Sequence, residues 1–123
     1  METAFTSEQL ERIGQEGEVR IETRSAAGAV HRTIIWIVVE GGEVFVRSVK
    51  GPRGRWYREL LAARTGAILI GRDRIEVSAE RTPDEESVER TTRALQQKYA
   101  ADPALRSMVR QDTLETTVRL RPA

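Results

Sequence analysis

The fold is decided by the stretch Val30-His-Arg-Thr-Ile-Ile-Trp-Ile-Val-Val-Glu40, followed by Gly41-Gly42 and Glu43-Val-Phe-Val-Arg-Ser-Val49. The unbroken apolar run of residues 34–39 indicates a strand that is buried on both faces, as in the centre of a covered or closed sheet. Gly41-Gly42 tolerates the positive φ angles of a two-residue hairpin turn. Residues 43–49 are therefore expected to pair back, antiparallel to residues 30–40.

The flanking sequence predicts more elements of both kinds. Apolar runs or strict alternation predict further strands at residues 18–24, 67–70, 74–80 and 113–121. Helical spacing of apolar residues predicts helices near the N-terminus, over about residues 55–64, after Thr82 and after Pro103. Together these elements predict one α+β domain over residues 1–123, with six antiparallel strands. A small barrel is the favoured arrangement because closure removes exposed sheet edges.

Composition limits the class of protein. With 39% hydrophobic and 32% charged residues, the chain is expected to be a soluble globular domain, and the absence of cysteine excludes disulfides and thiolate chemistry. The polar, acidic start at residues 1–8 does not resemble a signal peptide, and the longest apolar run is too short to cross a bilayer. We therefore expect a cytoplasmic protein that does not bind membranes.

A basic segment follows the central hairpin. Residues 47–58 hold five cationic side chains and no acid, whereas the net charge of the whole chain is only +1. The segment leads from a strand through a Gly/Pro loop into a helix, and a helix N-terminus already carries partial positive charge. Crowding Lys50, Arg53 and Arg55 there favours a bound anion such as a phosphate. The alternative is that these cations are simply solvated and that Trp56 is a core residue of the helix.

The predicted register adds residues to this site. In a hairpin centred on Gly41-Gly42, residues 33–34 fall opposite residues 49–50, which brings His31, Arg32 and Thr33 near the basic loop. Arg32 and Thr33 could donate hydrogen bonds to a phosphate. For His31 a polar role at the strand end is favoured over acid–base chemistry.

Several familiar sites are absent from the sequence. One histidine excludes a three-histidine zinc site or a metalloprotease pair, so no metal centre is expected. There is no Gly-x-Ser-x-Gly elbow and no Walker loop. The segment Gly51-Pro-Arg-Gly54 shares Gly-x-x-Gly with RNA-binding KH modules, but a KH loop joins two helices. With a net charge near zero, no nucleic-acid partner is expected.

The order of these motifs resembles the split-barrel flavin-binding superfamily. The residues concerned are His31-Arg-Thr33, then Arg47-Ser-Val-Lys-Gly51, then Trp56-Tyr57 and Leu60. The pattern is most similar to a small uncharacterised bacterial family with Arg-Ser-x-x-Gly-x-x-Gly-x-Trp-Tyr, and to the deazaflavin-dependent nitroreductases. Glu59 departs from the nitroreductase pattern, which often has Asn there.

This resemblance implies a six-stranded split barrel that forms a homodimer and holds FMN or a deazaflavin coenzyme by its phosphate. The implied cofactor-binding residues are Arg32, Thr33, Ser48, Lys50, Gly51, Arg53 and Trp56. The implied activity is an oxidoreductase acting on a small molecule, with hydride chemistry supplied by the cofactor. Tyr57 and His31 are weak candidates for a catalytic proton donor, and packing is the favoured role of Tyr57.

Two other functions stay open on the sequence. One is a non-catalytic module of the same fold that binds an anion or small molecule. The other is a cofactor-free enzyme that uses the barrel cavity.

Overall fold

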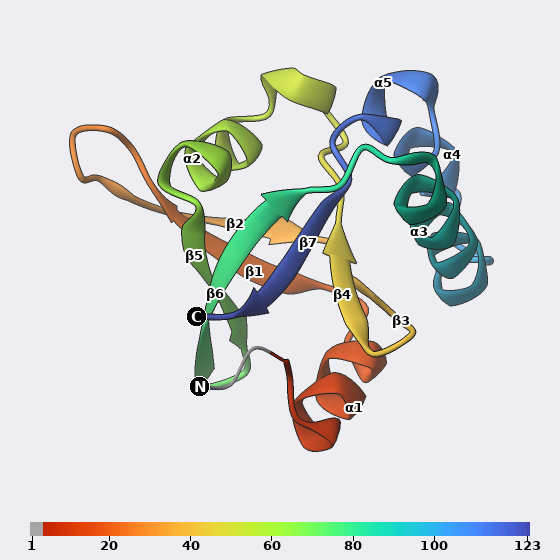
Figure 1. Ribbon diagram of the computed structural model, residues 1–123, viewed down its shortest axis with the longest axis horizontal. Coiled ribbons are helices and arrows are strands. Elements are labelled where there is room, and N and C mark those ends of the chain that lie inside the picture. Colours follow the sequence, from red (N-terminus) through yellow and green to blue (C-terminus); the bar gives the residue numbers. More distant parts are fainter. Residues whose placement is uncertain (1–3) are drawn as a thin grey trace.

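The computed structural model describes residues 4–123, so the first three residues of the polar start lie outside the described part (Figure 1). The strands are β1 (Val19–Arg24), β2 (Val30–Ile35), β3 (Val38–Glu40), β4 (Glu43–Val46), β5 (Thr65–Ile70), β6 (Asp73–Arg81) and β7 (Val118–Pro122). The helices are α1 (Ser7–Gln15), the 3₁₀ turn η1 (Gly51–Arg53), α2 (Arg55–Ala63), α3 (Glu85–Lys98), α4 (Leu105–Met108) and α5 (Gln111–Leu114). Over residues 4–123, no helix has the length and apolarity needed to span a bilayer.

The strands form one antiparallel sheet in the order β2-β1-β5-β6-β7-β4-β3. The two edge strands, β2 and β3, are consecutive in the chain and are separated only by Trp36 and Ile37. The sheet therefore curls until its edges meet at these two residues, and it stays open further along β2. The α+β class and the barrel-like antiparallel sheet are confirmed.

The predicted number of six strands is wrong, because the long strand at residues 30–40 is divided. Its first half pairs with β1, with Val19 opposite Ile35, and its second half pairs with β4, with Val38 opposite Phe45. Periodicity alone could not show this division, since residues 34–39 are uniformly apolar and carry no turn signal.

The last predicted strand is also shorter than expected. Residues 111–114 form α5, and β7 begins only at Val118. The hydroxyls of Thr116 and Thr117 donate to the carbonyl oxygens of Thr113 and Leu114, at 2.6 Å and 2.7 Å. Such local side-chain hydrogen bonds stabilise turns at the expense of strand pairing. For this reason the alternating pattern of residues 113–121 wrongly predicted a strand that begins at Thr113.

Helices cover the barrel at three places (Figure 1). Ile13 of α1 and Leu60 of α2 enter the barrel core, each fully buried, at opposite ends of the sheet. A second apolar cluster lies between α3 and the outer surface of β3 and β4, where Phe45 packs near Leu95. The outer surface of β2 keeps exposed apolar residues: Val30 is 41% exposed and Ile34 is 63% exposed.

The junction between β2 and β3 is held by the end of α3. The Tyr99 hydroxyl accepts from the Ile37 amide at 3.2 Å and donates to the Gly17 carbonyl at 2.6 Å. The Lys98 ammonium donates to the Ile37 carbonyl at 2.7 Å. Ile37 is fully buried and lies outside both strands, so these side chains supply the partners that its backbone would otherwise lack.

Raising the pH from about 8 to about 10 is expected to increase the free energy of unfolding through Lys98. Burial lowers the pKa of Lys98 to about 8, although the charge of Glu16 acts in the opposite sense. In this interval the unfolded chain keeps a proton that the folded protein has lost, so stability rises with pH. Urea unfolding across the interval checks this in the wild type and in Lys98→Met, which should lose the slope. Lys50, the other of the two lysines, is exposed, so Lys50→Met should retain it.

Candidate functional site

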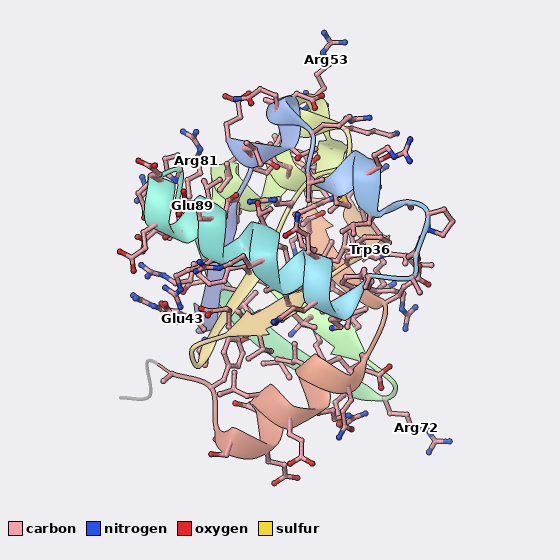
Figure 2. All side chains as sticks on the ribbon, turned by 90° about the vertical axis from the view of Figure 1, so that its right-hand side faces the viewer. Trp36, Glu43, Arg53, Arg72, Arg81 and Glu89 are labelled. Carbon is pink, nitrogen blue, oxygen red and sulfur yellow. The ribbon has the colours of Figure 1, made fainter. Side chains whose placement is uncertain are left out.

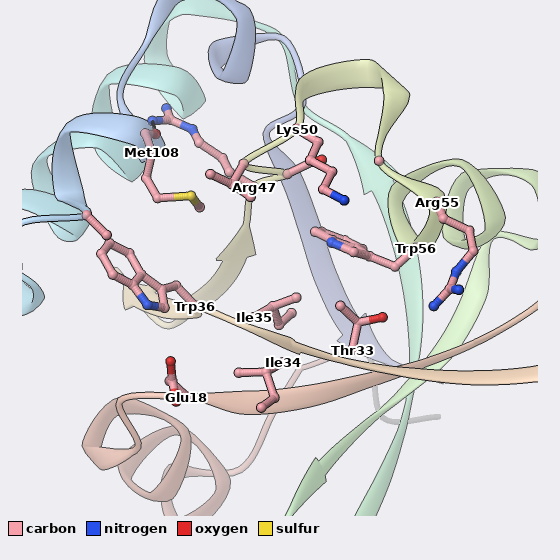
Figure 3. Close-up of a pocket in the computed structure, with 14 residues that line it drawn as sticks. Glu18, Thr33, Ile34, Ile35, Trp36, Arg47, Lys50, Arg55, Trp56 and Met108 are labelled. Carbon is pink, nitrogen blue, oxygen red and sulfur yellow. Dashed lines mark hydrogen bonds between the residues drawn. The ribbon is translucent and has the colours of Figure 1, made fainter.

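A cavity of about 440 Å³ lies where β2 and the chain after β4 move apart (Figure 3). Thr33 and Ile34 line one side, and Val49 and Lys50 line the other. The predicted proximity of these two pairs is therefore confirmed, although they face each other across a cavity and do not pair as strands. The volume is within the range of small-molecule sites.

The two ends of the cavity differ in chemistry (Figure 3). At one end, Lys50 and Arg55 lie near the indole of Trp56, at the start of α2. At the other end are Trp36 and Met108, and the ring of Trp36 stacks on Tyr99 with centroids 3.9 Å apart. The cavity thus joins a cationic end to an aromatic, apolar end.

Ser48 is a polar residue of the cavity wall whose hydroxyl has no partner in the described part of the fold. Its Oγ is fully buried and has no hydrogen-bond partner within residues 4–123, and Ser48 lines the cavity. A buried hydroxyl without a partner costs free energy. Gly54, the N-cap residue of α2, permits this arrangement because a Cβ at that position would collide with Ser48 Oγ. The hydroxyl is therefore held beside the cavity at the N-terminus of α2.

Ser48→Ala is expected to leave the ligand-free protein equally stable or up to about 1 kcal/mol more stable, because it removes a buried unpaired hydroxyl. The same change should weaken anion binding in the cavity by about tenfold, the value of one hydrogen bond. Urea unfolding and ligand titration measure the two effects. A fall in stability of the ligand-free protein would show that Ser48 Oγ has a partner in the fold.

The side chain of Arg47 forms its hydrogen bonds within the fold, so its main role is structural. It is 1% exposed, and its guanidinium donates to Thr117 Oγ1 at 2.9 Å and to the carbonyl oxygens of Val88 and Met108 at 2.7 Å and 3.3 Å. No carboxylate of residues 4–123 pairs with it. Burial lowers the pKa of Arg47 to about 10. The hydrogen bonds of Arg47 therefore connect the end of β4 to α3 and α4. The positive charge of the guanidinium also favours an anion in the adjoining cavity.

The structure brings together four of the predicted cofactor-binding residues: Thr33, Ser48, Lys50 and Trp56. It does not bring the other three to the cavity wall. Arg32 lies on the opposite face of β2, where its Nε donates to Glu22 at 3.1 Å. Arg53 projects into solvent from η1 (Figure 2), and Gly51 is buried at the start of that turn, with φ of 66°.

The two weak catalytic candidates lie beside the cavity and do not line it. Tyr57 is 5% exposed in the barrel core, edge-on to Trp56. His31 lies between β2 and α2, where its Nδ1 is 3.0 Å from both carboxylate oxygens of Glu59. Over residues 4–123, no group of three or more histidine or acidic side chains has the geometry of a metal site.

Two cavity residues, Trp36 and Met108, were missed by sequence reasoning. Arg55 was expected among the cations at the helix N-terminus, and it lines the cavity, although the resemblance pointed to Arg53. Trp36 was assigned to the buried centre of a continuous strand. In the structure the strand is interrupted at Trp36, and its side chain lines the cavity. Met108 belongs to a helix that is distant in sequence, so no local signal could have placed it here.

The solved structures similar to this chain include a reductase and a haem storage protein. The conserved hypothetical protein Rv2991 from Mycobacterium tuberculosis has a TM-score of 0.72 at 18% identity, covering 99% of this chain and 82% of that one. An F420-H2 dependent reductase, FDR-A, has a TM-score of 0.64 at 20% identity, covering 86% and 94%. The haem storage protein HutZ from Vibrio cholerae has a TM-score of 0.67 at 16% identity, covering 98% and 91%. At these identities the likeness shows a shared split-barrel fold.

No curated protein matches this chain in sequence. A bacterial family does match it, over residues 9–120, which include the strand pairs, α2 and the cavity walls. The resemblance to a small uncharacterised bacterial family of split-barrel type is thereby confirmed. The chain belongs to the family described as an uncharacterized protein conserved in bacteria, DUF2255.

Proposed function

We propose that this protein binds a flavin or deazaflavin cofactor in the cavity between β2 and α2 and acts as an oxidoreductase on a small molecule. The proposal assigns the cofactor phosphate to the cationic end and the ring system to the aromatic end. Four residues are proposed to hold the phosphate: Thr33, Ser48, Lys50 and Arg55.

The observation that carries this proposal is the buried, unpaired hydroxyl of Ser48 beside the N-terminus of α2. Gly54 provides no side-chain cap, so the first amides of the helix are available to an anion. Lys50 and Arg55 add two positive charges at the same end of the cavity. Hydroxyl, amide and cationic donors in one place match the needs of a phosphate.

The rest of the cavity fits a flat aromatic ring. Trp36, Ile34 and Met108 form an apolar wall, and Trp56 lies near the cationic end. A ring bound there would exchange water for aromatic and aliphatic contacts. The fold's likeness to an F420-H2 dependent reductase agrees with this use of the cavity.

A bound flavin or deazaflavin would supply the hydride chemistry. The chain's own residues then have to bind and orient the cofactor and exclude water from the cavity. The cavity residues Thr33, Lys50 and Trp56 are placed to do so. This division of roles does not require a nucleophile or a pair of catalytic carboxylates in the cavity.

We further propose that a second copy of the chain covers the cavity mouth. Ile34 and Val49 line the cavity and are 63% and 44% exposed, and Val30, on the same face of β2 as Ile34, is 41% exposed. Exposed aliphatic residues grouped at an open sheet edge are typical of a protein interface. Sedimentation is expected to show a dimer, which Ile34→Glu should dissociate, whereas a monomeric wild type at micromolar concentration contradicts the interface.

Titration with FMN, with coenzyme F420 and with haemin tests the cofactor. The chain has two tryptophans and both line the cavity, so its intrinsic fluorescence should be quenched as the cavity fills. Saturable quenching by FMN or F420, with a shifted cofactor spectrum, supports the proposal. Quenching by haemin alone would assign the cavity to haem. A response to inorganic phosphate and to none of the three would indicate the non-catalytic anion module.

A further inference from the structure

We propose that Glu18 selects and orients the ring of the bound cofactor by accepting a hydrogen bond from the imide N3–H of the pyrimidine edge of the ring. This inference rests on the proposed function. It concerns the aromatic end of the cavity, where the ring is assigned, and the carboxylate that borders this end.

Glu18 lines the cavity at its aromatic end. Figure 3 shows its carboxylate directed toward the indole of Trp36, beside Ile34. Among the described residues that line the cavity, Glu18 is the one acid, whereas Lys50 and Arg55 lie at the opposite end. All three charged side chains are exposed. The exposed charges of the cavity are therefore of opposite sign at its two ends.

The two neighbours of Glu18 in the chain hold it in this place. Val19, which follows it, is 3% exposed and forms the terminal pair of the ladder with β2. Gly17 precedes it, and the Gly17 carbonyl accepts a hydrogen bond from the Tyr99 hydroxyl at 2.6 Å. The Tyr99 ring in turn stacks on Trp36. The backbone of Glu18 is therefore fixed relative to the indole against which a bound ring would pack.

The carboxylate of Glu18 is available to a ligand. It takes part in none of the ion pairs formed within residues 4–123. Burial is the main cause of the raised pKa of Tyr99, and the charge of Glu18 acts in the same direction. The charge of this carboxylate therefore acts on the aromatic end of the cavity, and no cation of the described chain pairs with it.

The chemistry of the ring decides which of its edges suits Glu18. A ring that covers the apolar wall removes water from the carboxylate, and a desolvated carboxylate needs a donor. Oxidised isoalloxazine has a single N–H, at N3 between the two carbonyl groups of its pyrimidine edge, and its dimethylbenzene edge has none. A flavin bound with its phosphate at the cationic end is therefore expected to turn the pyrimidine edge toward Glu18.

The same carboxylate distinguishes a flavin from haem. The two propionates of haem suit Lys50 and Arg55 as well as a phosphate does, so the cationic end does not separate these ligand classes. The rest of the haem rim is hydrocarbon and offers no N–H, so a haem would desolvate Glu18 without giving it a partner. Glu18 thus supplies a discrimination that the cationic end lacks.

The charge of Glu18 also predicts a redox effect. Reduction of the ring adds negative charge to its pyrimidine edge, and a neighbouring carboxylate disfavours that charge. The wild type is therefore expected to favour the oxidised cofactor over the reduced one more strongly than a variant without this charge. A cofactor held in this way is a stronger reductant, which suits hydride donation to a small molecule.

The first test compares FMN with 3-methyl-FMN, in which a methyl group replaces the N3 hydrogen. The wild type is expected to bind FMN at least about tenfold more tightly, whereas Glu18→Ala should bind the two within about twofold. Both tryptophans line the cavity, so fluorescence quenching measures all these affinities. Haemin binding should not weaken in Glu18→Ala. Glu16→Ala, at an exposed acid that does not line the cavity, is the matched control and should keep the wild-type preference.

The second test measures the reduction potential of the bound cofactor. Glu18→Gln keeps an acceptor oxygen and removes the charge. In this variant the dissociation constant of oxidised FMN relative to that of reduced FMN should rise about tenfold, which raises the potential by about 30 mV for a two-electron couple. A purely structural role of Glu18 would not produce this shift, and Glu16→Gln should not show it. If F420 alone binds, the potential of bound F420 in Glu18→Gln decides in the same way.

The outcomes separate this inference from the proposed function. Equal affinity of the wild type for FMN and 3-methyl-FMN overturns the role of Glu18 and leaves the cofactor proposal standing, since quenching then shows that both are bound. A preference that persists in Glu18→Ala, or an unchanged potential in Glu18→Gln, has the same meaning. Absence of quenching by both FMN and F420 overturns both proposals.

Discussion

Replacing Lys50 and Arg55 together by glutamate is expected to weaken FMN binding by at least about 100-fold, because two charge-assisted hydrogen bonds of about 1.5 kcal/mol each are lost and the charge at the cavity end is reversed. Both side chains line the cationic end of the cavity. Both are exposed, so the melting temperature of the ligand-free protein should stay within a few kelvin. Quenching of tryptophan fluorescence measures the affinity directly.

The matched control is the double variant Arg53→Glu and Arg72→Glu, which changes the net charge by the same amount. Figure 2 shows both side chains projecting into solvent, and neither lines the cavity. At physiological salt this control should bind FMN within about threefold of wild type, since neither side chain lines the cavity and salt screens exposed charges. Equal losses in the two double variants would show that general charge, and not this cavity, holds the cofactor.

Arg47→Ala is expected to lower the free energy of unfolding by about 3–5 kcal/mol, the largest effect on stability of any change considered for the basic segment. The variant removes three hydrogen bonds that join β4 to α3, α4 and Thr117, and it leaves a void in the fully buried position. The corresponding fall in melting temperature is about 10–20 °C. Urea unfolding and calorimetry provide the two measurements.

Arg47→Met separates packing from hydrogen bonding. Methionine fills most of the volume and removes the cost of burying a charge, so its loss should be clearly smaller than that of alanine. Arg53→Ala, at an exposed arginine of the same segment, should change stability by less than about 0.5 kcal/mol. Similar small effects at Arg47 and Arg53 would contradict the assignment of Arg47 to the core.

Arg47 and Arg53 also illustrate the limits of sequence reasoning. In the sequence both are cations of one basic segment, and nothing local distinguishes them. The structure buries Arg47 among the carbonyl oxygens of α3 and α4, whereas it leaves Arg53 in solvent. The partners of Arg47 lie 41 to 70 residues further along the chain, and only folding brings them to it.

Glu59 is a similar case. Its departure from the nitroreductase pattern was visible in the sequence, but its meaning was not. The strand register places Thr23 opposite His31, and α2 then lays Glu59 over both. A position that differs from the pattern of a related family thus has a partner that sequence spacing could not identify.

The sequence by itself determined the α+β class, the turn of the central hairpin, the N-terminal helix and the basic entry to α2, because each depends on periodicity, turn residues or helix-start signals within a few neighbouring residues. The tertiary structure alone decided that residues 30–40 divide between the two edges of the sheet, since Trp36 and Ile37 could continue a strand as readily as end one. Partners of Ile37 from α3, far along the chain, stabilise that division. The cavity exists because of it, as β2 and the chain after β4 part at this point and leave Ser48, Lys50 and Arg55 facing Thr33 across a gap.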